Sequence, residues 1–186
     1  MRHLTTAQFH HYAAFWLAPK HADAFLTVFC RIEAGGWVFN WSAAFWSVFW
    51  FFYHKMYAVG WLSLAVYYGS NWLIDRGLAA LGAHPHWMVD GVHLVVMAAL
   101  MGALADRLYY RWCRTTIQRL WQRHHAVLGE EAFLDLLVRR GGVNLLRILW
   151  VMGGFVAGVA ALMLWLYTTD PGLFYRTLLA ALEGAA

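Results

Sequence analysis

The segment FNWSAAFWSVFWFFYHKMY, residues 39–57, carries ten large aromatic side chains in nineteen positions, which is more than one segment of a soluble core normally buries. Trp and Tyr rings favour the interface between membrane and water. The run ends in Lys55, whose stem can stay in an apolar environment while its amine reaches lipid headgroups. We therefore expect residues 37–54 to form an aromatic interfacial or re-entrant helix that Lys55 anchors, and both placements stay open.

The composition favours a membrane protein. The chain has 186 residues, of which 62% are hydrophobic and 13% charged, whereas soluble domains are about half apolar and a quarter charged. The length predicts a single membrane domain over residues 1–186. The net charge of +4 comes from basic residues beside apolar segments, and no nucleic-acid-binding signature accompanies it, so we expect lipid headgroups and no nucleic acid as partners.

Three segments are apolar over roughly the 20 residues that a membrane-spanning helix needs. They comprise residues 56–74, 87–105 and 145–167. Around them we expect an amphipathic arm over 1–36 with a helix at 21–34, a loop over 75–86, a basic segment over 106–144 and an amphipathic tail over 170–186. The predicted fold is an all-α helical integral membrane protein with about three transmembrane helices plus amphipathic and interfacial helices.

Basic residues predict the orientation of these spans. Residues 106–147 contain eight Arg, and residues 1–55 contain four Lys and Arg. Because basic segments stay on the cytoplasmic side, we expect the N-terminus and the basic segment there and the C-terminus on the opposite side. The basic stripe is expected to bind anionic headgroups or a partner protein; its residues are Arg111, Arg114, Arg119 and Arg123.

One group of residues has the spacing of a metal site. His86, Asp90 and His93 occur at i, i+4 and i+7, so a helix places them on one face, where imidazole and carboxylate can ligate a transition metal. The alternative is that the histidines are polar anchors at the outer surface and that Asp90 favours a helix start. Otherwise we expect no cofactor. The neighbouring pairs at 10–11 and 124–125 point about 100° apart on a helix and are expected to be solvated surface histidines.

No catalytic signature occurs in the sequence, so a non-enzymatic role is expected. The glycines at 153, 154 and 158 suit close helix packing within or between chains. A small transporter or channel made of several copies is the rival interpretation. It requires a polar path, for which Asn71, Asp90 and His93 are the candidates in or near the spans.

Three segments resemble a bacterial family of small membrane proteins known as domain of unknown function 2628. They are FWLAPKHADAFLTVFCRI at 15–32, the opening segment at 39–57, and GALADRLYYRWCRTTI at 102–117. The residues that match the family pattern are Phe39, Asn40, Trp41, Lys55, Met56, Tyr57, Gly102, Asp106, Tyr109 and Tyr110, followed by RRGGVN at 139–144. His54 stands where the family often has Arg. The resemblance implies a bacterial inner-membrane protein and no established activity.

These observations together predict an accessory or scaffold subunit that acts through helix packing and lipid contact, as a homo-oligomer or as part of a membrane complex. Asn40 and Trp41 are expected to cap and seat the aromatic helix, next to Lys55 and Tyr57. Asp106, with Arg107 or Tyr110, is expected to fix the cytoplasmic end of the second span.

Overall fold

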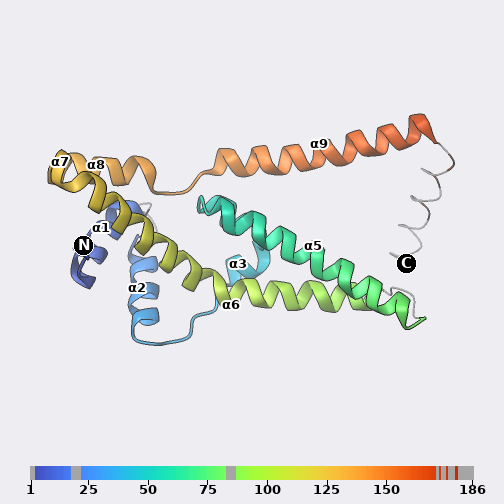
Figure 1. Ribbon diagram of the computed structural model, residues 1–186, viewed down its shortest axis with the longest axis horizontal. Helices are drawn as coiled ribbons and strands as arrows, with labels where there is room; N and C mark the ends of the chain where they lie inside the picture. Colours follow the sequence, from blue (N-terminus) through green and yellow to red (C-terminus); the bar gives the residue numbers. More distant parts are fainter. Residues whose placement is uncertain are drawn as a thin grey trace. The chain divides into compact units, whose positions relative to one another are not determined.

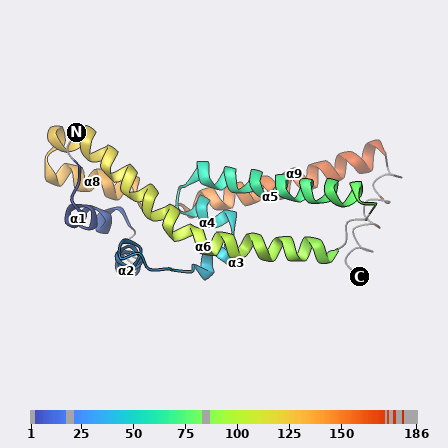
Figure 2. The same cartoon turned by 60° about the horizontal axis from the view of Figure 1, so that its bottom comes forward.

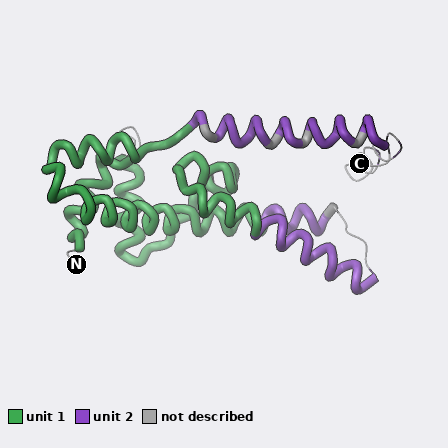
Figure 3. The backbone as a smooth tube through the Cα atoms, turned by 45° about the horizontal axis from the view of Figure 1, so that its top comes forward, with its two compact units in different colours: residues 1–65, 96–144 green, residues 66–95, 145–186 purple. Residues whose placement is uncertain are grey.

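The structure is a computed structural model that describes residues 3–17, 22–82 and 87–170, together with 172, 175 and 179. Its described residues are helical, without strands, which confirms the all-α prediction for this part of the chain. They form two compact units, residues 1–65 with 96–144 and residues 66–95 with 145–186 (Figure 3). The single membrane domain predicted over residues 1–186 stays a prediction.

The order of elements follows the chain in Figure 1. The N-terminal elements are α1 (Thr6–Trp16), α2 (Ala22–Glu33), α3 (Trp41–Trp46) and α4 (Val48–Tyr53). The long helices are α5 (Tyr57–Ala80), α6 (Trp87–Leu120) and α9 (Leu145–Thr169). Between α6 and α9 lie a π-helical turn (Trp121–His125), α7 (Ala126–Leu128) and α8 (Glu130–Arg140).

The N-terminal arm packs onto protein. A capping box between Thr5 and Gln8 begins α1, since each side chain satisfies a backbone N–H that the helix leaves unpaired. α1 then packs against α2 and α8, with Phe9 almost completely buried. Phe29 of α2 is fully buried and its ring lies 5.2 Å from that of Tyr110 on α6. The arm therefore forms part of the core of the first unit.

The aromatic run is two short helices, not the one helix expected. It breaks at Ser47, whose φ of 48° lies in the left-handed region, a conformation that ends regular α-helix. The two halves also differ in burial: Trp41 and Phe45 are 79% and 82% exposed, whereas Phe51 and Phe52 are 0% and 1% exposed. Both short helices lie beside α6 (Figure 2). One half of the run thus belongs to the core, and the other half remains on the surface.

The long helices also differ from the predicted spans. α5 continues to Ala80 and includes Asp75 and Arg76, which the sequence analysis places in a loop. Among the described residues, the helical stretches Met88–Leu128 and Ile148–Thr169 are long and apolar enough to cross a membrane. α5 is not one of them, because Asn71, Asp75 and Arg76 and its tyrosines reduce its hydropathy. α9 closely matches the predicted 145–167 span, and most of the predicted tail over 170–186 lies outside the described residues.

Candidate functional site

Asn40 caps α3 with one hydrogen bond and joins it to α6 through two others. Its side-chain oxygen accepts from the backbone N–H of Ala43 at 2.8 Å, which confirms the predicted N-cap of α3. Its own backbone N–H donates to the carbonyl of Gly102 at 2.9 Å. Its amide nitrogen donates to Asp106 Oδ1 at 2.6 Å. One residue therefore starts α3 and attaches that start to the middle of α6.

The partner of Asp106 differs from the sequence-based expectation. Asp106 is 4% exposed and receives the amide of Asn40. Arg107 instead reaches the carbonyl of Gly36 at 3.5 Å, and Tyr110 donates to Glu33 at 2.7 Å. Neighbouring residues on a helix point about 100° apart, so Asp106 and Arg107 face different neighbours. A buried carboxyl without a hydrogen-bond donor would be costly, which makes Asn40 the residue that permits its burial.

Gly102 allows the segment before α3 to approach α6 closely. A Cβ at this position would lie 2.5 Å from the ring of Phe39, which is closer than real side-chain contacts permit. The ring of Phe39 in turn contacts Trp41 edge to face at 4.7 Å. Trp41 therefore packs on one ring while most of its surface is exposed, so its indole contributes only part of the packing that holds α3 in place.

Lys55 contacts the end of a helix rather than only the solvent. Its backbone adopts a left-handed φ of 61°. Its amine donates to the carbonyl of Arg140 at 3.2 Å and also to the carbonyl of Gly141. These carbonyls lie at the C-terminus of α8, where the helix dipole attracts a cation. The structure therefore gives the predicted headgroup anchor a different role, as a cap that joins α4 to α8. Tyr57 begins α5 next to it, with its ring 6.3 Å from that of Phe52.

Two glycines follow the capped end of α8 and have different roles. Gly142 has a φ of 67° and its N–H donates to the carbonyl of Trp16 at 2.7 Å. A Cβ on Gly141 would overlap that same carbonyl oxygen. The pair therefore lets the end of α1 pack directly against backbone after α8.

Tyr109 is the centre of an aromatic core that the sequence analysis does not identify. It is 1% exposed, and the ring of His54 lies 4.7 Å from it. Its other ring neighbours come from α2, α4 and α6; they are Phe25, Phe29, Trp50 and Trp112. These contacts explain why His54 is buried at 4% exposure in an aromatic environment.

The basic stripe remains largely on the surface. Arg111, Arg119 and Arg123 are exposed. Arg114 differs, because its guanidinium donates to the hydroxyl of Tyr110 at 2.6 Å and lies 6.0 Å from the ring centre of Phe9. All four predicted arginines are therefore exposed for an anionic surface, and Arg114 also supports the packing of α1.

The histidine pairs at 10–11 and 124–125 differ from the predicted solvated residues, because at least one member of each pair contacts a carboxylate. His11 Nε2 and His125 Nε2 lie 3.8 Å and 2.7 Å from the carboxylate of Glu130. The hydroxyl of Tyr12 donates to the same carboxylate at 3.3 Å. Burial, followed by the nearby charge of Glu130, raises the pKa of Tyr12 above its ordinary value. Residues of α1 and of the π-helical turn thus meet at the start of α8.

The predicted metal ligands have different surroundings. His93 is 8% exposed, and its Nε2 lies 2.9 Å from the hydroxyl of Ser70 on α5. Asp90 is exposed, and His86 lies outside the described residues. Within the described part of the chain, no three His, Cys, Asp or Glu side chains are grouped so that they could hold a metal ion. Metal binding by all three residues stays a prediction.

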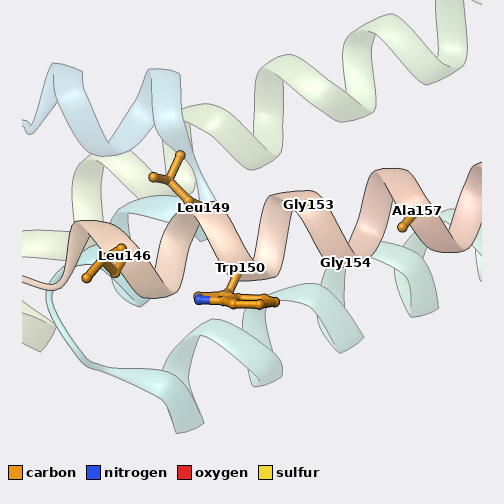
Figure 4. Close-up of a pocket in the computed structure, with 6 residues that line it drawn as sticks. All are labelled: Leu146, Leu149, Trp150, Gly153, Gly154 and Ala157. Carbon is orange, nitrogen blue, oxygen red and sulfur yellow. The ribbon is translucent and has the colours of Figure 1, made fainter.

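α9 has a groove along one of its sides (Figure 4). Its lining residues are Leu146, Leu149, Trp150, Gly153, Gly154 and Ala157. A Cβ on Gly153, Gly154 or Gly158 would meet no atom within 4 Å, so the described part of the chain does not itself require these glycines. The groove is apolar and has no titratable side chain.

In comparisons with known proteins, no family model, no curated protein and no solved structure matches the chain. The resemblance to domain of unknown function 2628 therefore stays a prediction. The geometry supplies helix junctions, an exposed aromatic surface and an apolar groove.

Proposed function

We propose that the chain is a non-enzymatic protein of a bacterial inner membrane that acts as an accessory or scaffold subunit. The observation that carries the proposal is the surface of α9. The stretch Ile148–Thr169 is long and apolar enough to cross a bilayer, and none of its apolar window is buried. So much exposed apolar surface on one helix is costly in water and ordinary in lipid.

Exposed aromatic residues of the first unit support an interfacial location. Trp37 and Trp41 are 62% and 79% exposed, and Phe45 is 82% exposed. Such rings fit the boundary between headgroups and acyl chains. In the proposed orientation the exposed arginines of α6 face the cytoplasmic leaflet, whose anionic lipids attract them. The third span is assigned to α5 on its 24-residue length, which exceeds the length needed to cross the hydrocarbon region.

The scaffold role is assigned to the groove on α9. In lipid, helices associate where small residues let their backbones approach closely. Gly154 and Gly158 have the spacing of such a contact, and the apolar walls of the groove suit a second apolar helix. The partner is either another copy of this chain or a different membrane subunit.

Membrane fractionation followed by native mass spectrometry tests this proposal. The chain is expected in the membrane pellet after alkaline carbonate washing, and gently extracted protein is expected to carry additional polypeptide mass. Gly154→Leu should release that mass, whereas Met152→Phe, which adds bulk on the side of α9 away from Gly154, should retain it. Recovery in the carbonate supernatant contradicts the membrane location, and a bare monomer contradicts the scaffold role.

Cysteine labelling tests the orientation. Cys30 is exposed and lies in the segment proposed to be cytoplasmic, and Leu81 at the end of α5 is 83% exposed. An impermeant maleimide added to spheroplasts is expected to label a Leu81→Cys variant that lacks both native cysteines. It should label Cys30 only after lysis. The reverse pattern would show the opposite orientation.

A further inference from the structure

Cys30, His10 and Glu33 form a connected group on the surface of the first unit, and the scaffold role does not use it. Cys30 Sγ lies 4.0 Å from His10 Nδ1. His10 Nε2 lies 3.0 Å from Glu33 Oε2. The group therefore has the order thiol, imidazole and carboxylate, which is the arrangement of a nucleophile, a base and the residue that orients the base.

The two nitrogens of His10 face different partners, and this determines which of them can accept a proton. A carboxylate accepts hydrogen bonds and does not donate them. The charge of Glu33 Oε2 lies 3.0 Å from Nε2, outside hydrogen-bond geometry, and favours the imidazole proton on Nε2. The lone pair of Nδ1 then faces the thiol. The thiol proton can move to Nδ1, and Glu33 then stabilises the imidazolium that forms.

Glu33 is itself fixed from its other side. The hydroxyl of Tyr110 donates to Glu33 Oε1 at 2.7 Å, and the guanidinium of Arg114 donates to that hydroxyl at 2.6 Å. Glu33 is thus held by α6 while it orients a histidine of α1. The hydrogen bond from Tyr110 restricts the rotamer of Glu33 and keeps its charge beside His10 Nε2.

Cys30 combines exposure with this neighbour. It is exposed, whereas Cys113 is buried. Cys30 lies in the last turn of α2, where the helix dipole disfavours a thiolate. The location on the helix therefore does not activate the thiol, and any activation must come from His10. Thiols beside histidine form the thiolate that acts as the nucleophile.

We infer that Cys30 is an activated thiol that accepts an acyl group from a thioester donor. His10 Nδ1 takes the thiol proton, and the thiolate attacks the carbonyl carbon of the donor. The new carbon–sulfur bond forms at Cys30, the carbon–sulfur bond of the donor breaks, and the departing thiolate takes the proton from His10. No oxidant or reductant is needed. Glu33 is a positioning residue, because it acts through His10.

A fatty-acyl donor fits the position of Cys30 best. α2 is an amphipathic helix, and Leu26 lies one turn before Cys30 with part of its side chain exposed. An acyl chain on Cys30 would add an apolar anchor to this helix. The choice of a fatty-acyl donor rests on the proposed membrane location, whereas the activation of the thiol does not.

Alkylation kinetics of the full chain in detergent test the activation. Cys113→Ser leaves Cys30 as the reacting thiol, and iodoacetamide is the probe. His10→Gln is expected to slow alkylation at pH 7 by about tenfold or more, since positioned bases commonly contribute that much. Glu33→Gln should slow it less, and His11→Ala is the matched control that should not. The dependence of the alkylation rate on pH should change in His10→Gln, because the base that takes the thiol proton is removed.

Incubation with palmitoyl coenzyme A in vesicles tests the acyl donor. One palmitoyl mass, removable by hydroxylamine, is expected on the Cys113→Ser protein and not on Cys30→Ser. Far-ultraviolet circular dichroism confirms that each variant is folded. Equal alkylation rates for His10→Gln and its parent, with the same pH profile, overturn the activation. Normal activation without palmitoyl transfer overturns the acyl-acceptor inference, and neither result bears on membrane insertion.

Discussion

Replacing Asn40 tests the junction between α3 and α6 most directly. Its amide donates to Asp106 at 2.6 Å, and its side-chain oxygen caps α3 through Ala43 at 2.8 Å. A lost N-cap costs about 1 kcal/mol. A hydrogen bond to a carboxyl group contributes about 1–3 kcal/mol, and most when the carboxyl is ionised. Asn40→Ala removes both interactions and should lower the free energy of unfolding by about 2–4 kcal/mol.

A second substitution separates the two contributions. Serine also caps helices but cannot reach Asp106 with an amide, so Asn40→Ser should lower the free energy of unfolding by about 1–3 kcal/mol. In a double-mutant cycle with Asp106→Ala, the coupling energy should be about 1–3 kcal/mol, because each single variant already breaks the same contact.

Unfolding in mixed micelles of increasing SDS content measures these energies, with tryptophan fluorescence and circular dichroism as two probes. Asn71→Ser is the matched control: Asn71 is half-buried within α5, and its replacement should change the free energy of unfolding by less than about 0.5 kcal/mol. A coupling energy below about 0.5 kcal/mol would show that the hydrogen bond between Asn40 and Asp106 does not stabilise the fold.

Three further changes probe other contacts of the first unit. Lys55→Met removes the amine from the carbonyls that end α8 and should lower the free energy of unfolding by about 1 kcal/mol; an unchanged midpoint in the same SDS titration would argue against the cap. Gly141→Ala forces a Cβ onto the carbonyl of Trp16 and should lower the free energy of unfolding by more than about 2 kcal/mol. In Gly153→Ala the new Cβ meets no atom within 4 Å, so the midpoint of the SDS titration should stay unchanged or rise. The pKa of Tyr12 is raised in the folded protein, so its contribution to stability is present below the ordinary tyrosine pKa of about 10 and is lost as the pH rises through the folded pKa. The free energy of unfolding of Tyr12→Phe should therefore depend less on pH in the alkaline range than that of its parent. The same pH dependence in both proteins would contradict this.

Local signals predicted several elements well. The predicted helix at 21–34 and the predicted apolar span over 145–167 correspond to α2 and α9. The cap at Asn40 follows from the preference of Asn for the residue before a helix. These features depend on residues close together in the sequence, so pattern alone was sufficient to identify them.

The aromatic run shows where pattern is insufficient. Its composition indicates an interface along its whole length, yet Phe51 and Phe52 are buried while Trp41 and Phe45 are exposed. The run divides at the turn at Ser47, and its second half packs through Trp50 and His54 on Tyr109, more than 50 positions away in the chain. Periodicity describes which residues share a face, but it does not say which neighbour covers that face.

The sequence by itself determined that the chain is helical, rich in apolar surface and punctuated at glycines, because helix formation, capping and hydropathy are properties of short segments. Only the tertiary structure decided the partners of the polar residues. Asp106 faces Asn40, Lys55 caps α8, and His10 stands between a thiol and a carboxylate. These pairs join residues 20 to 85 positions apart. Their geometry depends on how helices pack, which no local pattern encodes.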